Sequence, residues 1–99
     1  MARLNWTLQA ETDLKNIYEY IAMDSTKYAS IHINRIRVRA GALKRQPRLG
    51  RVVPEMGIDN IRELIFGNYR IIYRIVNPDR IDIITIYHSA RILRLTEPK

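Results

Sequence analysis

Arginine and histidine are the residue types in this sequence with the clearest chemical capacity. Arg62, Arg70 and Arg74 recur within one strand-like stretch, and Arg91 follows near the C-terminus. A guanidinium stabilises negative charge but stays protonated, so it cannot transfer a proton near neutral pH. His88 can, because an unperturbed imidazole titrates at about pH 6.5. The alternative to proton transfer is a structural role, in which this strand-end histidine only donates a hydrogen bond to a loop carbonyl.

Other kinds of site have little support in the sequence. His32 and His88 are the two imidazoles and there is no cysteine, so the spacing needed for zinc or another transition metal is missing. The four glycines are isolated and form no phosphate-binding loop, and no serine lies in a nucleophile-elbow pattern. We therefore expect neither a metal nor another cofactor.

The arginines lie on a predicted β-hairpin over residues 61–76, IRELIFGNYRIIYRIV. Gly67-Asn68 is expected to supply the positive φ angles of a two-residue turn. Side chains alternate along a strand, which places Arg70, Ile72, Arg74 and Val76 opposite a core face. That predicted core face carries Tyr69, Ile71, Tyr73 and Ile75.

A third strand is predicted over 81–87, after turn-forming residues at 77–80. Three strands joined by such short turns form an antiparallel meander. The connector at 46–60 contains two prolines and two glycines, and Val52 and Val53 are expected to form a short edge strand within it. Ser89 is a candidate cap for one short closing helix.

The N-terminal half predicts a strand at 3–6 and then a helical hairpin. Thr7 is a candidate N-cap of the first helix, and residues 24–26 interrupt the helical pattern. The second helix is expected to run for about twenty residues until Pro47. Ile31 and Val38 lie off its apolar stripe, which indicates either deeper burial or a partner contact, and we favour burial.

These elements predict a single α+β domain over residues 1–99. An N-terminal helical hairpin packs on a small, mainly antiparallel sheet, and a short C-terminal helix follows. The net charge of +7 suits an anionic partner, although solubility alone can explain such a charge. The absence of cysteine suits a reducing cytosol, and we assign the protein to the cytoplasm. No apolar run approaches the roughly 20 residues that cross a bilayer, so we expect no membrane partner.

Several short motifs occur in an order that is similar to the ParE branch of the RelE/ParE toxin superfamily. They begin with Trp6-Thr7 and Tyr20-Ile21, and the resemblance covers nearly the whole chain. The later motifs are Pro47 with Gly50-Arg51, Pro54-Glu55, Ile61-Arg62-Glu63-Leu64, Tyr69-Arg70-Ile71-Ile72-Tyr73, and Tyr87-His88 with Arg91. Their combination is far more specific than any one of them.

This resemblance implies the toxin of a bacterial type II toxin–antitoxin pair. Such a toxin is held inactive, within a hetero-oligomer, by an antitoxin protein encoded beside it. Two activities occur in the superfamily. ParE-like toxins poison DNA gyrase and leave cleaved DNA trapped on it, whereas RelE-like toxins are endonucleases that cut messenger RNA in the ribosomal A site.

The RelE-like reaction needs more than arginines. Attack by the RNA 2′-hydroxyl requires a proton acceptor, cations for the phosphorane-like charge, and an acid for the departing 5′ oxygen. Arg62, Arg70 and Arg91 match the cationic positions of the RelE-like pattern. Residues 92–99 contain no tyrosine or histidine where that pattern has one, and Leu64 stands where a second strand lysine would assist. His88 is then the one candidate for proton transfer.

We therefore predict a toxin that inhibits DNA gyrase without an active site of its own, with a ribosome-dependent mRNA endonuclease as the alternative. The antitoxin is expected to bind through an amphipathic helix across exposed apolar and basic surface. Candidates for contact with the target or the antitoxin are Arg62, Arg70, Arg74, His88 and Arg91. In the endonuclease alternative the catalytic residues would be Arg62, Arg70, His88 and Arg91. A plain nucleic-acid-binding module ranks last, because no aromatic platform for bases is evident.

Overall fold

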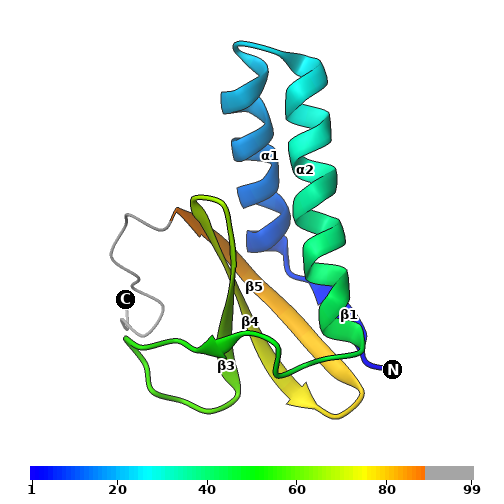
Figure 1. The fold of residues 1–99 in the computed structure, drawn as a ribbon, viewed down its shortest axis with the longest axis vertical. Coiled ribbons are helices and arrows are strands. Elements are labelled where there is room, and N and C mark those ends of the chain that lie inside the picture. Colours follow the sequence, from blue (N-terminus) through cyan, green and yellow to red (C-terminus); the bar gives the residue numbers. More distant parts are fainter. Residues whose placement is uncertain (89–99) are drawn as a thin grey trace.

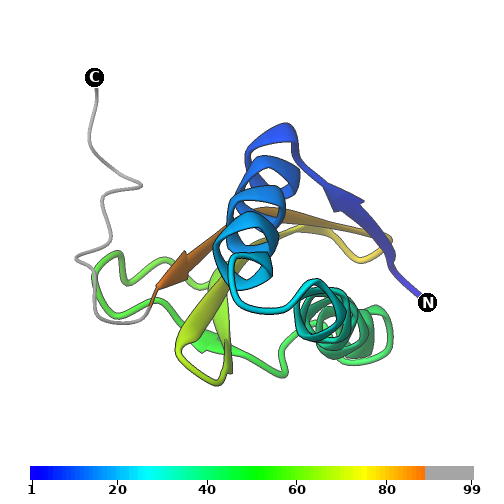
Figure 2. The same cartoon turned by 90° about the horizontal axis from the view of Figure 1, so that it is seen from above.

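Two antiparallel helices lie on one face of a five-stranded sheet (Figures 1 and 2). The computed structural model describes residues 1–88, so the predicted C-terminal helix and Arg91 lie outside the described residues. The elements are β1 (Arg3–Trp6), α1 (Leu8–Ala22), α2 (Thr26–Gly41), the 3₁₀ turn η1 (Ala42–Lys44), β2 (Arg51–Val52), β3 (Ile61–Phe66), β4 (Tyr69–Asn77) and β5 (Arg80–His88). No helix among the described residues is long and apolar enough to cross a bilayer.

The sheet has the strand order β1-β5-β4-β3-β2. Strands β2 to β5 pair antiparallel, which confirms the predicted meander, and β1 pairs parallel with β5 at one edge. The helical hairpin separates β1 from β2 along the chain. In the sheet, β1 nevertheless lies beside β5. The predicted α+β fold with a mainly antiparallel sheet is confirmed.

The predicted N-cap of the first helix is present, and Ser25, one of the three residues expected to interrupt the helical pattern, caps the second helix. The hydroxyl oxygen of Thr7 accepts the Ala10 N–H at 3.1 Å, and that of Ser25 accepts the Tyr28 N–H at 3.0 Å. The Thr7 hydroxyl also lies 2.9 and 2.8 Å from the carbonyl oxygens of Ile83 and Ile84 on β5. One side chain therefore starts α1 and attaches it to the sheet. The second helix is shorter than expected, because α2 ends at Gly41 and the chain tightens into η1.

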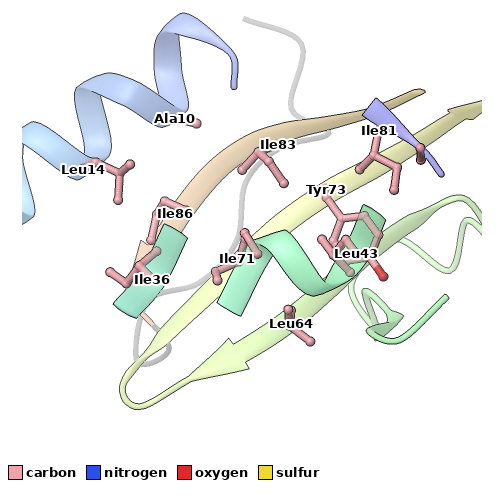
Figure 3. Close-up of a cluster of buried hydrophobic side chains, with 12 residues drawn as sticks. Ala10, Leu14, Ile36, Leu43, Leu64, Ile71, Tyr73, Ile81, Ile83 and Ile86 are labelled. Carbon is pink, nitrogen blue, oxygen red and sulfur yellow. The ribbon is translucent and has the colours of Figure 1, made fainter. Parts of the chain in front are cut away.

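The core fills the space between the helices and the sheet. Figure 3 shows its side chains converging from both layers. Its buried members include Ala10, Leu14, Ile36, Leu43, Leu64, Ile71, Tyr73, Ile81, Ile83 and Ile86. Tyr69 and Ile75 pack against this cluster, which confirms the predicted core face of β4.

The opposite face of the sheet is also covered at its centre, which the alternating pattern did not predict. Ile72 and Val53 are fully buried there, and Met56, Ile61, Ile84 and Tyr87 pack against them. The segment that follows β2 supplies Val53 and Met56. This face is covered because the connector folds back over the sheet, and strand periodicity alone does not reveal that path.

Two further expectations need correction. Among the described non-glycine residues none has a positive φ, so Gly67 alone, at φ 56°, supplies the positive angle of the hairpin turn. A type I′ turn needs a positive φ at both central residues, whereas a type II′ turn needs it only at the first, which is Gly67 here. Ile31 and Val38 are not buried but 38% and 67% exposed, because α2 packs through a single stripe and these residues lie outside it.

A β-bulge in β5 is stabilised by α1. The register shifts between Ile72 and Tyr73, so that Ile72 pairs with Thr85 and Tyr73 with Ile83. The carboxylate of Asp13 accepts the Ile86 N–H at 3.0 Å and also accepts the Thr85 hydroxyl. A helix side chain thus satisfies a backbone donor beside the irregular step in the ladder.

Tyr73 organises the connector between α2 and β3. Its buried hydroxyl accepts the Gly50 N–H at 3.0 Å and donates to the Pro47 carbonyl at 2.7 Å. A Cβ on Gly50 would lie 2.3 Å from the Glu63 carbonyl oxygen, so only glycine fits this approach. The connector is therefore ordered by contacts with the sheet.

We expect Tyr73→Phe to lower the free energy of unfolding by about 1–3 kcal/mol, because the Gly50 N–H and the Pro47 carbonyl lose their buried partner. Urea denaturation of the variant and the wild type measures this difference. Tyr28→Phe is the control, since Tyr28 is 52% exposed. Equal losses in the two variants would mean that the Tyr73 hydroxyl does not stabilise the connector.

Candidate functional site

The register of the sheet decides which predicted residues share a face. Tyr73 faces the helices, and Arg62 lies directly opposite it on β3, so Arg62 is on the helix side. Arg70 and Arg74 alternate with Tyr69 and Tyr73 and therefore point away from the helices. His88 pairs with Tyr69 and returns to the helix side. The candidate residues are thus divided between the two faces.

Arg70 is buried within an ion-pair network on the face away from the helices. Its Nε donates to Glu63 at 2.6 Å, and its two terminal nitrogens donate to Glu55 at 2.9 and 2.8 Å. The Arg70 side chain is 8% exposed and the Glu63 side chain is fully buried. Arg51 also pairs with Glu63. Arg70 is therefore neither part of a solvated face nor available to a partner's carboxylates.

This network shifts the pKa values of its members. The hydrogen bonds from Arg70 lower the pKa of Glu55 to about 2, from an ordinary 4.5. Hydrogen bonds to Glu55 and Glu63 raise the pKa of Arg70 further above its already high value. Both groups are fixed in their charged forms near neutral pH.

Arg62 has a structural role within the connector. Its guanidinium donates to the carbonyls of Asp59 and Gly50, both at 2.9 Å, and to the Asp59 carboxylate at 3.0 Å. Its side chain is 12% exposed. Arg62 and Tyr73 thus hold the same Gly50 segment from neighbouring strands.

Arg74 lies on the same face as Arg70 but remains exposed. It pairs across the sheet with Asp82, whose carboxylate accepts from Asn5 at 3.1 Å and from Arg80 at 2.9 Å. The sheet neighbour of Arg74 is therefore already hydrogen-bonded. Of the four candidates within the described residues, Arg74 is the cation most available to a partner.

His88 borders a cleft of about 590 Å³ between α1 and the β3–β4 turn. Its ring packs edge-on against Tyr69 at 5.6 Å between centroids, and Tyr69 in turn packs against His32 at 5.7 Å. The other residues lining the cleft are Asp13, Asn16, Ile17, Tyr20, Asn68 and Ile86. Among the described residues this cleft therefore has no lysine or arginine beside the histidine.

The described residues do not bring Arg62, Arg70 and His88 together. Arg91 lies outside the described residues, so its position relative to them stays a prediction. No group of three or more histidine, cysteine or acidic side chains suited to a metal occurs within residues 1–88. The arrangement stabilises the fold with Arg62 and Arg70 and leaves His88 in a separate cleft, against Tyr69 and with Asp13 among the lining residues.

The sequence reasoning missed the buried carboxylate of Glu63. A signal for it was present, because a two-residue turn at 67–68 fixes Glu63 opposite Ile72 and thus diagonal to Arg70 on one face. Glu55 had no such signal. It reaches Arg70 only because the connector folds over the sheet.

Comparison with known proteins agrees with this architecture. The family model described as ParE toxin of type II toxin-antitoxin system, parDE, matches residues 4–93. The chain belongs to the ParE toxin family. It is thus a toxin of a type II toxin–antitoxin system. No match to this chain was found among curated proteins.

Two solved structures share the fold of this ParE-family toxin. The chromosomal ParDE toxin–antitoxin system from P. aeruginosa matches at 24% identity and a TM-score of 0.73, over 89% of this chain and 96% of the other. The toxin–antitoxin complex RelBE2 from Mycobacterium tuberculosis matches at 22% identity and a TM-score of 0.56, over 88% and 96%.

We expect Arg70→Met to lower the free energy of unfolding of the toxin by about 3–5 kcal/mol, because it leaves the buried Glu63 charge with Arg51 alone. Urea denaturation provides the measurement. Arg74→Met removes an exposed arginine from the same strand and face, and should change stability by less than about 0.5 kcal/mol. Similar effects of the two substitutions would contradict the structural role of Arg70.

The Glu55 contact predicts a specific pH dependence. Because its folded-state pKa is about 2 and its ordinary value is 4.5, Glu55 stabilises the fold above about pH 4.5 and loses that contribution as the pH falls toward 2. The urea midpoint of Glu55→Gln should therefore decline less than that of the wild type between these values. Glu19→Gln, an exposed carboxylate on α1, should retain the wild-type decline. An unchanged decline in Glu55→Gln would refute this assignment.

Proposed function

We propose that this ParE-family toxin inhibits bacterial growth by poisoning DNA gyrase in the cytoplasm, and that an antitoxin protein encoded beside it neutralises it. The toxin acts through its surface, without an active site of its own. The family match supports this proposal, and so does the similarity in fold to proteins solved as toxin–antitoxin systems.

The candidate residues lie on two different faces of the sheet, and this division favours gyrase inhibition over RNA cleavage. A ribonuclease site needs a proton-transferring group and cations close to the same phosphate. Here Arg70 points away from the helices and is bonded to Glu55 and Glu63, while His88 lies on the helix side. The Arg70 guanidinium is therefore hydrogen-bonded within the protein and is not free to bind a substrate phosphate.

The remaining basic surface suits an acidic protein partner. Eight cations make no ion pair among the described residues, namely Arg3, Lys15, Lys27, Arg35, Arg39, Lys44, Arg45 and Arg74. Most of them are exposed on the helical hairpin and its flanks. Such a surface speeds encounter with an acidic protein and favours specificity.

Early effects on macromolecular synthesis test the proposal. After induction of the toxin without its antitoxin, incorporation of labelled thymidine should fall within minutes while incorporation of labelled methionine continues. Purified toxin should also trap cleaved plasmid DNA on purified gyrase. Early loss of methionine incorporation with continuing replication would overturn the gyrase proposal and support the ribosome-dependent endonuclease.

His88→Ala separates the two mechanisms at one residue. A gyrase poison should retain its effect on thymidine incorporation, because it needs no proton donor. An endonuclease should lose RNA cleavage while the variant still folds and binds the antitoxin. Circular dichroism and co-purification with the antitoxin provide the controls for folding and binding.

A further inference from the structure

A second cleft, distinct from the one beside His88, lies between β1 and the C-terminal end of α2. Figure 1 shows these two segments next to each other near the N-terminus. The cleft has a volume of about 450 Å³ and is lined by residues from β1, α2 and η1. The Ala2 N–H donates to the Lys44 carbonyl at 2.9 Å, which fixes the strand against the end of the helix.

The charge of this cleft is entirely basic among its described lining residues. Arg3, Arg37 and Lys44 surround it and no carboxylate lines it. Arg3 and Lys44 are exposed and form no ion pair within residues 1–88. Arg37 is already oriented, because its terminal nitrogen donates to Glu11 at 2.7 Å. The cleft therefore presents two exposed, unpaired cations and a third that is held in place by Glu11.

The wall of the cleft is apolar. Leu4 and Trp6 line it while also packing against the main core. The guanidinium carbon of Arg37 lies 4.9 Å from the centroid of the Trp6 ring. Because Arg37 lies over that ring and the ring is partly buried against the core, less of it is available for stacking by a nucleic-acid base. An apolar side chain flanked by carboxylates fits this surface better than a nucleotide does.

Gly41 is the feature that the fold itself leaves unexplained. It is the last residue of α2 and has right-handed helical angles, φ −58° and ψ −26°, although glycine is a poor helix former. A Cβ built on it meets no atom within 4 Å, in contrast to Gly50, whose Cβ would clash with the backbone. Neither backbone conformation nor internal packing requires a glycine here. Gly41 therefore leaves open space beside the helix backbone in the lining of the cleft.

The apolar surface continues outward from the cleft. Val38 lies one helical turn before Gly41 and is 67% exposed. Val38 does not line the cleft, but it places an exposed apolar side chain on the adjoining turn of α2. A partner segment can therefore contact both the cleft and the adjoining turn of the helix.

We propose that this cleft binds an acidic segment of the antitoxin. The segment places an apolar side chain beside Leu4 and Trp6, and its carboxylates pair with Arg3 and Lys44. Its backbone passes close to Gly41. This inference rests on the proposed neutralisation by an antitoxin, and it adds the docking surface and the chemistry of the docked segment.

Trp6 provides a direct test, because it is the one tryptophan in the sequence. The full chain is labelled with 5-fluorotryptophan and titrated with the unlabelled full-length protein encoded by the adjacent antitoxin gene. The ¹⁹F resonance of Trp6 should shift on binding. Arg3→Glu and Lys44→Glu should each raise the Kd by about tenfold or more. Arg48→Glu makes the same charge change at an exposed arginine of the connector, outside this cleft and outside the unpaired basic surface, and should leave the Kd within about twofold.

Gly41→Ala separates binding from stability. Since the added methyl group meets no atom of this chain, and alanine favours the helix, the variant should unfold at a higher urea concentration than the wild type. It should nevertheless bind the antitoxin about tenfold more weakly. Ser30→Ala, at an exposed position of α2, should leave antitoxin binding unchanged. Unchanged affinity in Gly41→Ala would overturn the close approach at this residue.

The outcomes distinguish this inference from the function on which it rests. If the antitoxin binds but the Trp6 resonance and the charge-reversed variants are unaffected, the docking site is wrong and the proposed function stands. If the wild-type chain binds no antitoxin, the proposed neutralisation fails and the docking site fails with it. A Trp6 shift produced by a DNA duplex or a single-stranded RNA, and not by the antitoxin, would assign the cleft to nucleic acid instead.

Discussion

The buried ion pair between Arg70 and Glu63 determines which groups of this toxin are available to a partner. Glu63 is fully buried on the face away from the helices, where an unpaired carboxylate would be strongly unfavourable. Arg70 neutralises it and also holds Glu55, which attaches the connector to the sheet. The most buried cation of the hairpin is thereby committed to the fold. It is therefore not available to a partner, whereas Arg74 on the same strand is exposed.

Arginines thus have two distinct roles in this chain. Arg62 and Arg70 hold the connector over the sheet, one from each face, and their side chains are nearly inaccessible. The exposed arginines and lysines concentrate on the helical hairpin, its turn into η1 and the β1 edge. A net charge of +7 therefore describes two populations of side chains, and only the exposed one can contribute to binding an acidic protein.

The helical layer and the connector cover the sheet unequally. The helices bury the face that carries Tyr73, whereas the connector covers only the centre of the opposite face, through Val53 and Met56. The two clefts lie at the borders of the helical layer, one beside His88 and one beside Trp6. They differ in charge, since the first has no cation among its described lining residues and the second has three. The two borders of the helical layer therefore present different chemistry.

The amino-acid sequence by itself determined the elements of this protein. The Thr7 cap, the interruption at 24–26, the 67–68 turn and the alternation along β4 depend on residues close in the chain, so local patterns were sufficient to predict them. Only the tertiary structure decided which arginines are buried in ion pairs and that Val38 stays exposed. Glu55 meets Arg70, and Val38 stays exposed, because of how the connector and α2 lie on the sheet. The Glu55–Arg70 contact joins residues far apart in sequence, and the exposure of Val38 depends on how α2 packs. Neither the burial nor the distances involved are specified by a local pattern.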